Sequence, residues 1–196
     1  MKSKPGEQKN WKETLLAHYH QYRPVADAGL FILITYLAHI LYWANISWFT
    51  SLPWFLSFQE FMKESLFQHS YGIVRHWYDI TPSGTTMWFS NVGYIEINNS
   101  CSGVKQFYQI LVLFLLFPGP WLKKLWYIPL SLVIMYGVNV FRILVLSFVL
   151  MNWPQHWDFS HDWILRPFFY VVIFILWIIW NERLREAPSS PKEAIS

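Results

Sequence analysis

Apolar stretches that approach the length needed to cross a lipid bilayer constrain the fold of this chain more than any other feature. A transmembrane helix needs about 20 mostly apolar residues. Four stretches approach or exceed this length: Val25–Phe49, Gly103–Phe117, Leu125–Met151 and Ile164–Trp180. Hydrophobic residues make up 54% of the chain and charged residues only 14%, which excludes an ordinary soluble domain. The sequence therefore predicts an all-α membrane protein, a small multipass bundle of about four transmembrane helices.

The distribution of Lys and Arg predicts which side of the membrane each end of the chain occupies, because basic residues collect on the cytoplasmic side. The N-terminal segment, the loop after the second stretch and the C-terminal tail together hold ten of the 15 basic residues. The other loops clearly hold only Lys63 and Arg75. We therefore expect residues 1–24 to be a cytoplasmic segment, residues 25–181 the transmembrane domain, and residues 182–196 a disordered cytoplasmic tail.

The segment between the first two stretches would then lie on the outer face. Apolar and polar residues at helical spacing over Trp54–Tyr78 predict an amphipathic helix lying on the membrane. One face would carry Phe58, Phe61, Met62 and Leu66, and the other Gln59, Glu60, Lys63 and Glu64. The composition of Thr85–Asn98 favours a short hairpin with its turn at Asn91-Val92-Gly93. These elements would either cap the bundle or form a platform that receives a substrate.

Cys101 is the only cysteine, so an intrachain disulfide is excluded. It stands where the second apolar stretch begins, after Asn98-Asn99-Ser100. The reactive form of cysteine is the thiolate, which is favoured at a helix N-terminus and beside a protonated histidine or an arginine. Cys101 is therefore either a buried packing residue or a nucleophile on the outer face.

Arg142 lies within the third stretch, roughly 13 Å from its outer end at a rise of 1.5 Å per residue. An arginine at that depth costs on the order of 2.5–3.5 kcal/mol. Such a residue usually faces the bundle interior and has a function, the alternatives being snorkelling to the headgroups or a helix–helix hydrogen bond. Asn139 lies one turn earlier on the same helix face.

The loop before the fourth stretch, Asn152–Trp163, carries two histidines and two aspartates. His161 stands at the mouth of the fourth stretch and His156 lies further out, and the residues alone leave both open as partners of Cys101. A metal site is not expected, because there is one thiol and no HExxH or paired-cysteine spacing. No cofactor is expected. Nucleic acid is not expected as a ligand either, since the chain has no basic, aromatic-interleaved patch.

Together these side chains would form a thiol-nucleophile site at the outer ends of three helices. Cys101 would attack a carbonyl carbon, and His161 would take up the thiol proton and later protonate the leaving amine. Arg142 would stabilise the oxyanion of the acyl-transfer intermediate.

The motifs resemble those of the exosortase/archaeosortase family, above all its short single-domain members from Bacteroidetes-type bacteria. The resemblance lies mainly in residues 94–181 and rests on three matches: Cys101-Ser102-Gly103 opening a membrane helix, Asn139-Val140-Phe141-Arg142 in the next helix, and a histidine, His161, at the start of a later one. It implies Cys101, Arg142 and His161 as catalytic residues, and favours His161 over His156. Ser102, Gly103 and Asn139 would support the site or bind substrate.

The resemblance also implies an activity and a location. The chain would be a cysteine peptidase or transpeptidase in the bacterial cytoplasmic membrane, with its site on the outer face. Its partners would be the bilayer and exported proteins whose C-terminal sorting signal it cleaves through a thioacyl intermediate.

Two alternatives belong to other functional classes. A non-catalytic membrane assembly factor or polysaccharide-export accessory would use Cys101 for packing and would tolerate Cys101→Ser. A transporter is disfavoured, because the chain has no evident inverted repeat and few intramembrane charges.

Overall fold

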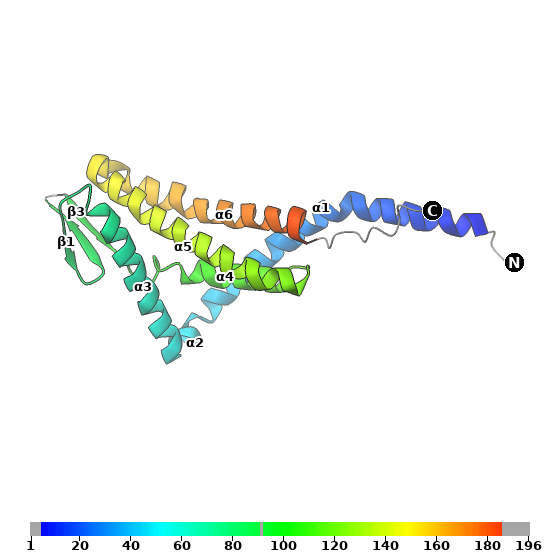
Figure 1. The fold of residues 1–196 in the computed structure, drawn as a ribbon, viewed down its shortest axis with the longest axis horizontal. Helices are drawn as coiled ribbons and strands as arrows, with labels where there is room; N and C mark the ends of the chain where they lie inside the picture. The colour runs from blue at the N-terminus through cyan, green and yellow to red at the C-terminus, as the bar shows by residue number, and fades with distance from the viewer. Residues whose placement is uncertain (1–4, 91, 186–196) are drawn as a thin grey trace.

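The computed structural model describes residues 5–90 and 92–185, with side chains from Tyr22 onward, so most of the predicted disordered tail lies outside the described residues. Helix α1 (Pro5–Ala44) is long and continuous, and it includes most of the N-terminal segment. The short helix α2 (Ile46–Thr50) follows it and redirects the chain into α3 (Pro53–Val74). In Figure 1, α1 runs down to α2, and α3 leads away from α2 to a small sheet.

The remaining helices form the bundle. Helix α4 (Val104–Leu116) packs against both α1 and α5 (Trp121–Asn152). After the 3-10 turn η1 (Pro154–His156), the chain returns alongside α5 through the π-helix η2 (Phe159–Leu165), α6 (Arg166–Ile179) and the π-helix η3 (Trp180–Leu184) (Figure 1).

Three helical segments of the described chain are long and apolar enough to cross a membrane: Tyr22–Ala44, Trp121–Asn152 and Phe159–Leu184. The all-α multipass class predicted from the sequence is confirmed. The second predicted stretch forms α4, a shorter apolar helix of 13 residues. At 1.5 Å per residue it is about 20 Å long, less than the hydrocarbon core of about 30 Å.

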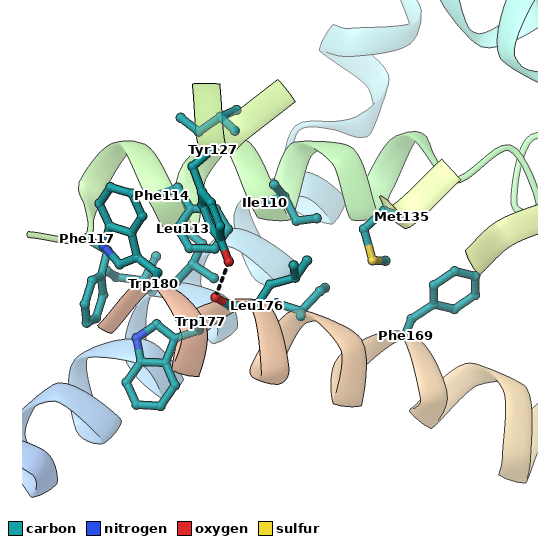
Figure 2. Close-up of a cluster of buried hydrophobic side chains, with 13 residues drawn as sticks. Ile110, Leu113, Phe114, Phe117, Tyr127, Met135, Phe169, Leu176, Trp177 and Trp180 are labelled. Carbon is teal, nitrogen blue, oxygen red and sulfur yellow. Dashed lines mark hydrogen bonds between the residues drawn. The ribbon is translucent and has the colours of Figure 1, made fainter. Parts of the chain in front are cut away.

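Aromatic side chains fill the core between α4, α5 and α6. Phe114, Phe117, Tyr127, Trp177 and Trp180 are buried together, as Figure 2 shows. The hydroxyl of Tyr127 donates a hydrogen bond of 2.7 Å to the backbone carbonyl oxygen of Leu176. A buried hydroxyl needs such a partner, so this bond fixes how α5 sits on α6.

A three-stranded antiparallel sheet follows α3 in the order β1 (Ile80–Ser83), β2 (Thr86–Phe89), β3 (Gly93–Glu96). The predicted hairpin is present as β2 and β3, but Gly93 of the predicted turn belongs to β3 and pairs with Phe89, and Asn91 lies outside the described residues. Strand β1 was not predicted from the sequence, because Pro82 and Ser83 are poor strand formers. Only Ile80 of this strand is buried.

Helix α3 covers the predicted stretch as far as Val74, and one residue of the predicted polar face, Gln59, lies on its buried face. Met62 and Leu66 are buried as expected, whereas Phe58 and Phe61 are exposed and Gln59 is buried beside Met62. The physical reason is that α3 packs against α5, so its inner face is chosen by helix packing as well as by hydrophobicity.

The sheet and α3 pack onto one end of the bundle, which we call the sheet end. Leu66 from α3, Met87 and Ile95 from the sheet, and Ile143 and Leu146 from α5 share one buried cluster. Cys101 packs against this cluster. The segment that precedes Cys101 is therefore folded against the helices that follow it.

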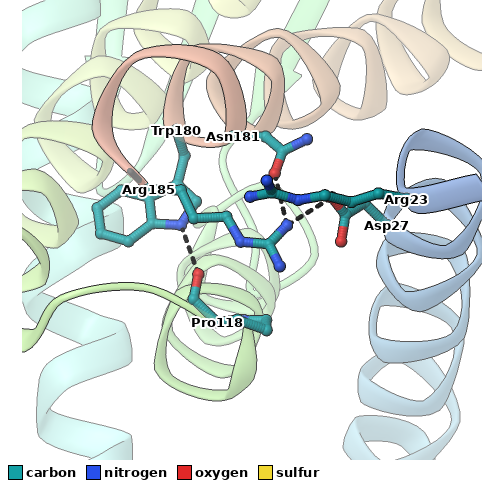
Figure 3. Close-up of polar contacts among 6 residues, drawn as sticks. All are labelled: Arg23, Asp27, Pro118, Trp180, Asn181 and Arg185. Carbon is teal, nitrogen blue, oxygen red and sulfur yellow. Dashed lines mark hydrogen bonds and ion pairs between the residues drawn. The ribbon is translucent and has the colours of Figure 1, made fainter. Parts of the chain in front are cut away.

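A polar cluster closes the opposite end of the bundle (Figure 3). Arg185 donates hydrogen bonds to Asp27 of α1 and to Asn181, the latter at 2.9 Å. The indole nitrogen of Trp180 donates to the carbonyl oxygen of Pro118 at 3.2 Å. These contacts join the middle of α1, the segment after α4 and the C-terminal end of the described chain.

Candidate active site

A hydrogen-bonded turn holds Cys101 directly before α4. The backbone N–H of Cys101 donates to the carbonyl oxygen of Asn98 at 3.0 Å and to its side-chain Oδ1 at 3.2 Å. The buried hydroxyl of Ser102 donates to the carbonyl oxygen of Asn99 at 2.8 Å and accepts from the N–H of Val104 at 3.4 Å. Ser102 thus fixes the turn and satisfies a free N–H at the start of α4.

Gly103 and Asn139 join this turn to α5. Gly103 has a φ of +79°, a conformation that residues with a Cβ rarely adopt. A Cβ at this position would lie only 2.8 Å from Nδ2 of Asn139. The same Nδ2 donates a hydrogen bond of 2.8 Å to the carbonyl oxygen of Cys101. The Cys101-Ser102-Gly103 motif therefore contacts the motif that contains Asn139. Asn139 needs a residue without a Cβ at Gly103, and the carbonyl oxygen of Cys101 needs the amide of Asn139.

Arg142 lies one helical turn beyond Asn139 and is buried, with 5% of its surface exposed. Its NH2 group donates a hydrogen bond of 2.8 Å to Nε2 of His161, and its guanidinium lies 5.5 Å from the centre of the Phe169 ring. The Nε of Arg142 is buried and has no hydrogen-bond partner among the described residues. Arg142 therefore faces the bundle interior and keeps a free donor.

The contacts of His161 determine its tautomer. A guanidinium only donates hydrogen bonds, so Nε2 of His161 must accept from Arg142 and be unprotonated. Nδ1 then carries the proton and donates a hydrogen bond of 2.7 Å to Oδ1 of Asp162. Asp162 also pairs with Arg166 at 3.4 Å, and the Trp157 ring lies nearly parallel to the imidazole, with centroids 6.1 Å apart. The imidazole is held with its basic nitrogen toward Arg142.

A cavity of about 590 Å³ at the sheet end brings Cys101 and His161 to one space. Strand β3 forms one wall, and residues from α5, η1 and η2 form the other. Within the described chain no hydrogen bond joins the thiol of Cys101 to His161. His156 is exposed and does not line the cavity.

The sequence reasoning missed two residues of this site. Asp162 orients the imidazole of His161, and Trp157 stacks on it. The signal for Asp162 was its place next to His161, where an acidic side chain can reach Nδ1. Trp157 carries no comparable signal, because aromatic residues are common throughout this chain. Over the described ranges, no three His, Cys, Asp or Glu side chains converge in a way that could hold a metal ion.

The comparison with protein families gives a match. The model described as Transmembrane exosortase (Exosortase_EpsH) matches residues 28–180, more than three quarters of the chain. The motifs locate the resemblance mainly in residues 94–181, but this match also takes in most of the first span, α3 and the sheet. No curated protein and no solved structure matches the chain. Because the match covers more than half of the chain and includes Cys101, Arg142 and His161, the chain belongs to the transmembrane exosortase family.

Proposed function

We propose that this protein is a membrane cysteine peptidase or transpeptidase that cleaves the C-terminal sorting signal of exported proteins. Cys101 is the nucleophile, His161 the general base and acid, and Arg142 the electrostatic stabiliser. The observation that carries the proposal is the 2.8 Å hydrogen bond from Arg142 to Nε2 of His161 beside a cavity that Cys101 also lines. A packing cysteine and a helix–helix arginine would not require an imidazole with a fixed tautomer beside them.

The first chemical step uses the lone pair on Nε2, which must first give up its hydrogen bond from Arg142. His161 accepts the thiol proton of Cys101, and the thiolate attacks the carbonyl carbon of the scissile peptide bond to form a C–S bond. The C–N bond then breaks, His161 returns the proton to the leaving amine, and a thioester remains on Cys101. Water or an acceptor amine attacks this thioester, which releases the product and restores the thiol.

Arg142 has two roles in sequence. At rest its NH2 group donates to Nε2 and holds the neutral imidazole. Once Nε2 has taken the thiol proton it can no longer accept that bond, so the guanidinium becomes free to donate to the oxyanion. Arg142 is buried behind His161 and does not line the cavity, so this donation requires its guanidinium to turn toward the cavity, in a setting shielded from water.

The orientation proposed for the protein follows from its basic residues. With both termini in the cytoplasm, the sheet end faces outward, and exported proteins anchored in the same bilayer meet the cavity there. In this proposal the reaction takes place at the outer face of the bacterial cytoplasmic membrane.

The test is a comparison of exported proteins in cells that carry single variants. Cys101→Ala, Arg142→Ala and His161→Ala should each abolish removal of C-terminal segments, measured by mass spectrometry of C-terminal peptides. His156→Ala is the matched control and should process normally. Normal processing by Cys101→Ala or Cys101→Ser, with the protein present at its usual level, would contradict the proposal and favour the accessory role.

A further inference from the structure

Strand β3 turns an unpaired edge toward the cavity. It is the last strand of the sheet, with β2 on one side only. All four of its residues, Gly93 through Glu96, line the cavity. If a face of the strand lined the cavity, only every second residue would take part in the lining, because successive side chains point to opposite faces. Four consecutive lining residues therefore indicate that the cavity runs along the backbone edge of β3.

The register identifies which backbone groups face this edge. The N–H of Ile97 donates to the carbonyl oxygen of Thr85 at 3.0 Å, so these two residues form a hydrogen-bonded pair. In an antiparallel ladder such pairs alternate, which puts Ile95 opposite Met87 in the next bonded pair. The N–H and C=O groups of Tyr94 and Glu96 consequently point away from β2, toward the open edge.

The cavity wall also has a defined charge. Glu96 and Asp158 both line it, both are exposed, and neither forms an ion pair within the described chain. Lys63 borders a neighbouring hollow with Glu96, but its ammonium pairs with Glu60 at 2.8 Å. His161 is neutral in the tautomer that its contacts require, and the guanidinium of Arg142 lies behind it and does not line the cavity. The lining itself therefore carries negative charge and favours a positively charged ligand.

The edge of β3 leads directly to the nucleophile. Cys101 follows Glu96 by five residues, through the turn at Asn98, and all three residues line the same cavity. A peptide laid along β3 would therefore pass the thiol. An unpaired strand edge is otherwise a site for unwanted pairing between chains, which an occupant would cover.

We propose that the substrate segment binds as an added strand on β3, with main-chain hydrogen bonds to Tyr94 and Glu96 and a Lys or Arg side chain facing Glu96 and Asp158. This inference rests on the proposed function and adds to it the conformation and charge of the substrate. Main-chain pairing supplies affinity in such strand addition, and the side-chain contacts supply selectivity.

Peptidyl reagents that alkylate a thiol can test this in the full-length protein in lipid nanodiscs. The probe is acetyl-Ala-Ala-Lys-Ala chloromethyl ketone, and the measured quantity is the second-order rate of Cys101 alkylation. Each peptide nitrogen of the probe is methylated in turn. Methylation should slow alkylation by about tenfold at alternate positions and have little effect between them, because only alternate groups face the partner strand. Replacement of Lys by Glu should slow it by a similar factor.

Variants of the protein provide the matched comparison. Both Tyr94→Pro and Tyr94→Ala remove the phenol ring. Tyr94→Pro also removes the edge N–H, without removing a bond to β2, whereas Tyr94→Ala keeps that N–H. We expect Tyr94→Pro to react about tenfold more slowly than Tyr94→Ala with the peptidyl probe. Both should react equally with iodoacetamide, which needs no strand. Glu96→Gln combined with Asp158→Asn should remove the preference for Lys over Glu.

The outcomes separate this inference from the function on which it rests. Equal rates for all N-methylated probes, with alkylation still dependent on His161, would overturn strand addition and leave the peptidase intact. Alkylation by the parent probe that is unaffected by His161→Ala would overturn the proposed function itself. The N-methyl series uses the wild-type protein, so it decides the question even if Tyr94→Pro does not fold.

Discussion

Gly103→Ala tests how the turn before α4 is fixed. The φ of +79° at Gly103 costs a residue with a Cβ about 1–2 kcal/mol. The new Cβ would lie 2.8 Å from Nδ2 of Asn139, so the amide must move and give up its bond to the Cys101 carbonyl oxygen. Loss of that bond costs about 1 kcal/mol. The structure thus predicts a decrease of about 2–3 kcal/mol in the free energy of unfolding.

Reversible unfolding in mixed detergent micelles measures this change, and Gly137→Ala is the matched control. Gly137 lies inside α5, where an added Cβ meets no atom within 4 Å. Alanine should raise stability there by up to about 1 kcal/mol, because it loses less backbone entropy than glycine. Gly103→Ala should also slow the alkylation of Cys101, while Gly137→Ala should not.

The pairing of Gly103 with Asn139 adds a further condition. If the two act through one hydrogen bond, the effects of Gly103→Ala and Asn139→Ala on unfolding should be less than additive in the double variant. Gly103→Ala with the stability and Cys101 reactivity of Gly137→Ala would refute the reasoning. So would strict additivity with Asn139→Ala.

Three further substitutions have defined outcomes. Asp162→Asn removes the carboxylate that fixes the imidazole tautomer. It should slow processing at least about tenfold, but by less than the roughly 10²–10⁴-fold that acid–base catalysis supplies. The rate of C-terminal release measures this effect. Arg185→Ala should lower the free energy of unfolding by about 1–3 kcal/mol, because it leaves the buried carboxylate of Asp27 with weaker pairing; micelle unfolding measures it. Gly119→Ala should cost about 1–3 kcal/mol in the same assay, because its Cβ would lie 2.5 Å from the Trp180 ring.

The sequence was sufficient for the features that depend on composition and local pattern. Apolar length predicted the helices, and the resemblance of Cys101-Ser102-Gly103 and Asn139-Val140-Phe141-Arg142 to the family motifs predicted the family. The structure adds the reason that these motifs occur together, since Asn139 bonds the backbone of Cys101 and contacts Gly103.

Features that depend on packing between distant segments were not accessible from the sequence. The buried face of α3 includes Gln59 because α3 packs on α5, whereas hydrophobicity alone pointed to Phe58 and Phe61. The short α4 could not be distinguished from a full span by composition. Strand β1 forms because β2 offers it a partner, although its own residues favour a strand weakly.

The most direct measurement is the rate at which a membrane-impermeant thiol reagent alkylates Cys101 in spheroplasts across pH 5 to 9. Wild type is compared with His161→Ala and Arg142→Ala, and the lone cysteine makes the signal specific. The account predicts rapid labelling from outside at pH 6 that becomes slower in both variants. Labelling that requires dissolution of the membrane, or that has the same pH profile in all three proteins, would contradict an activated thiolate on the outer face.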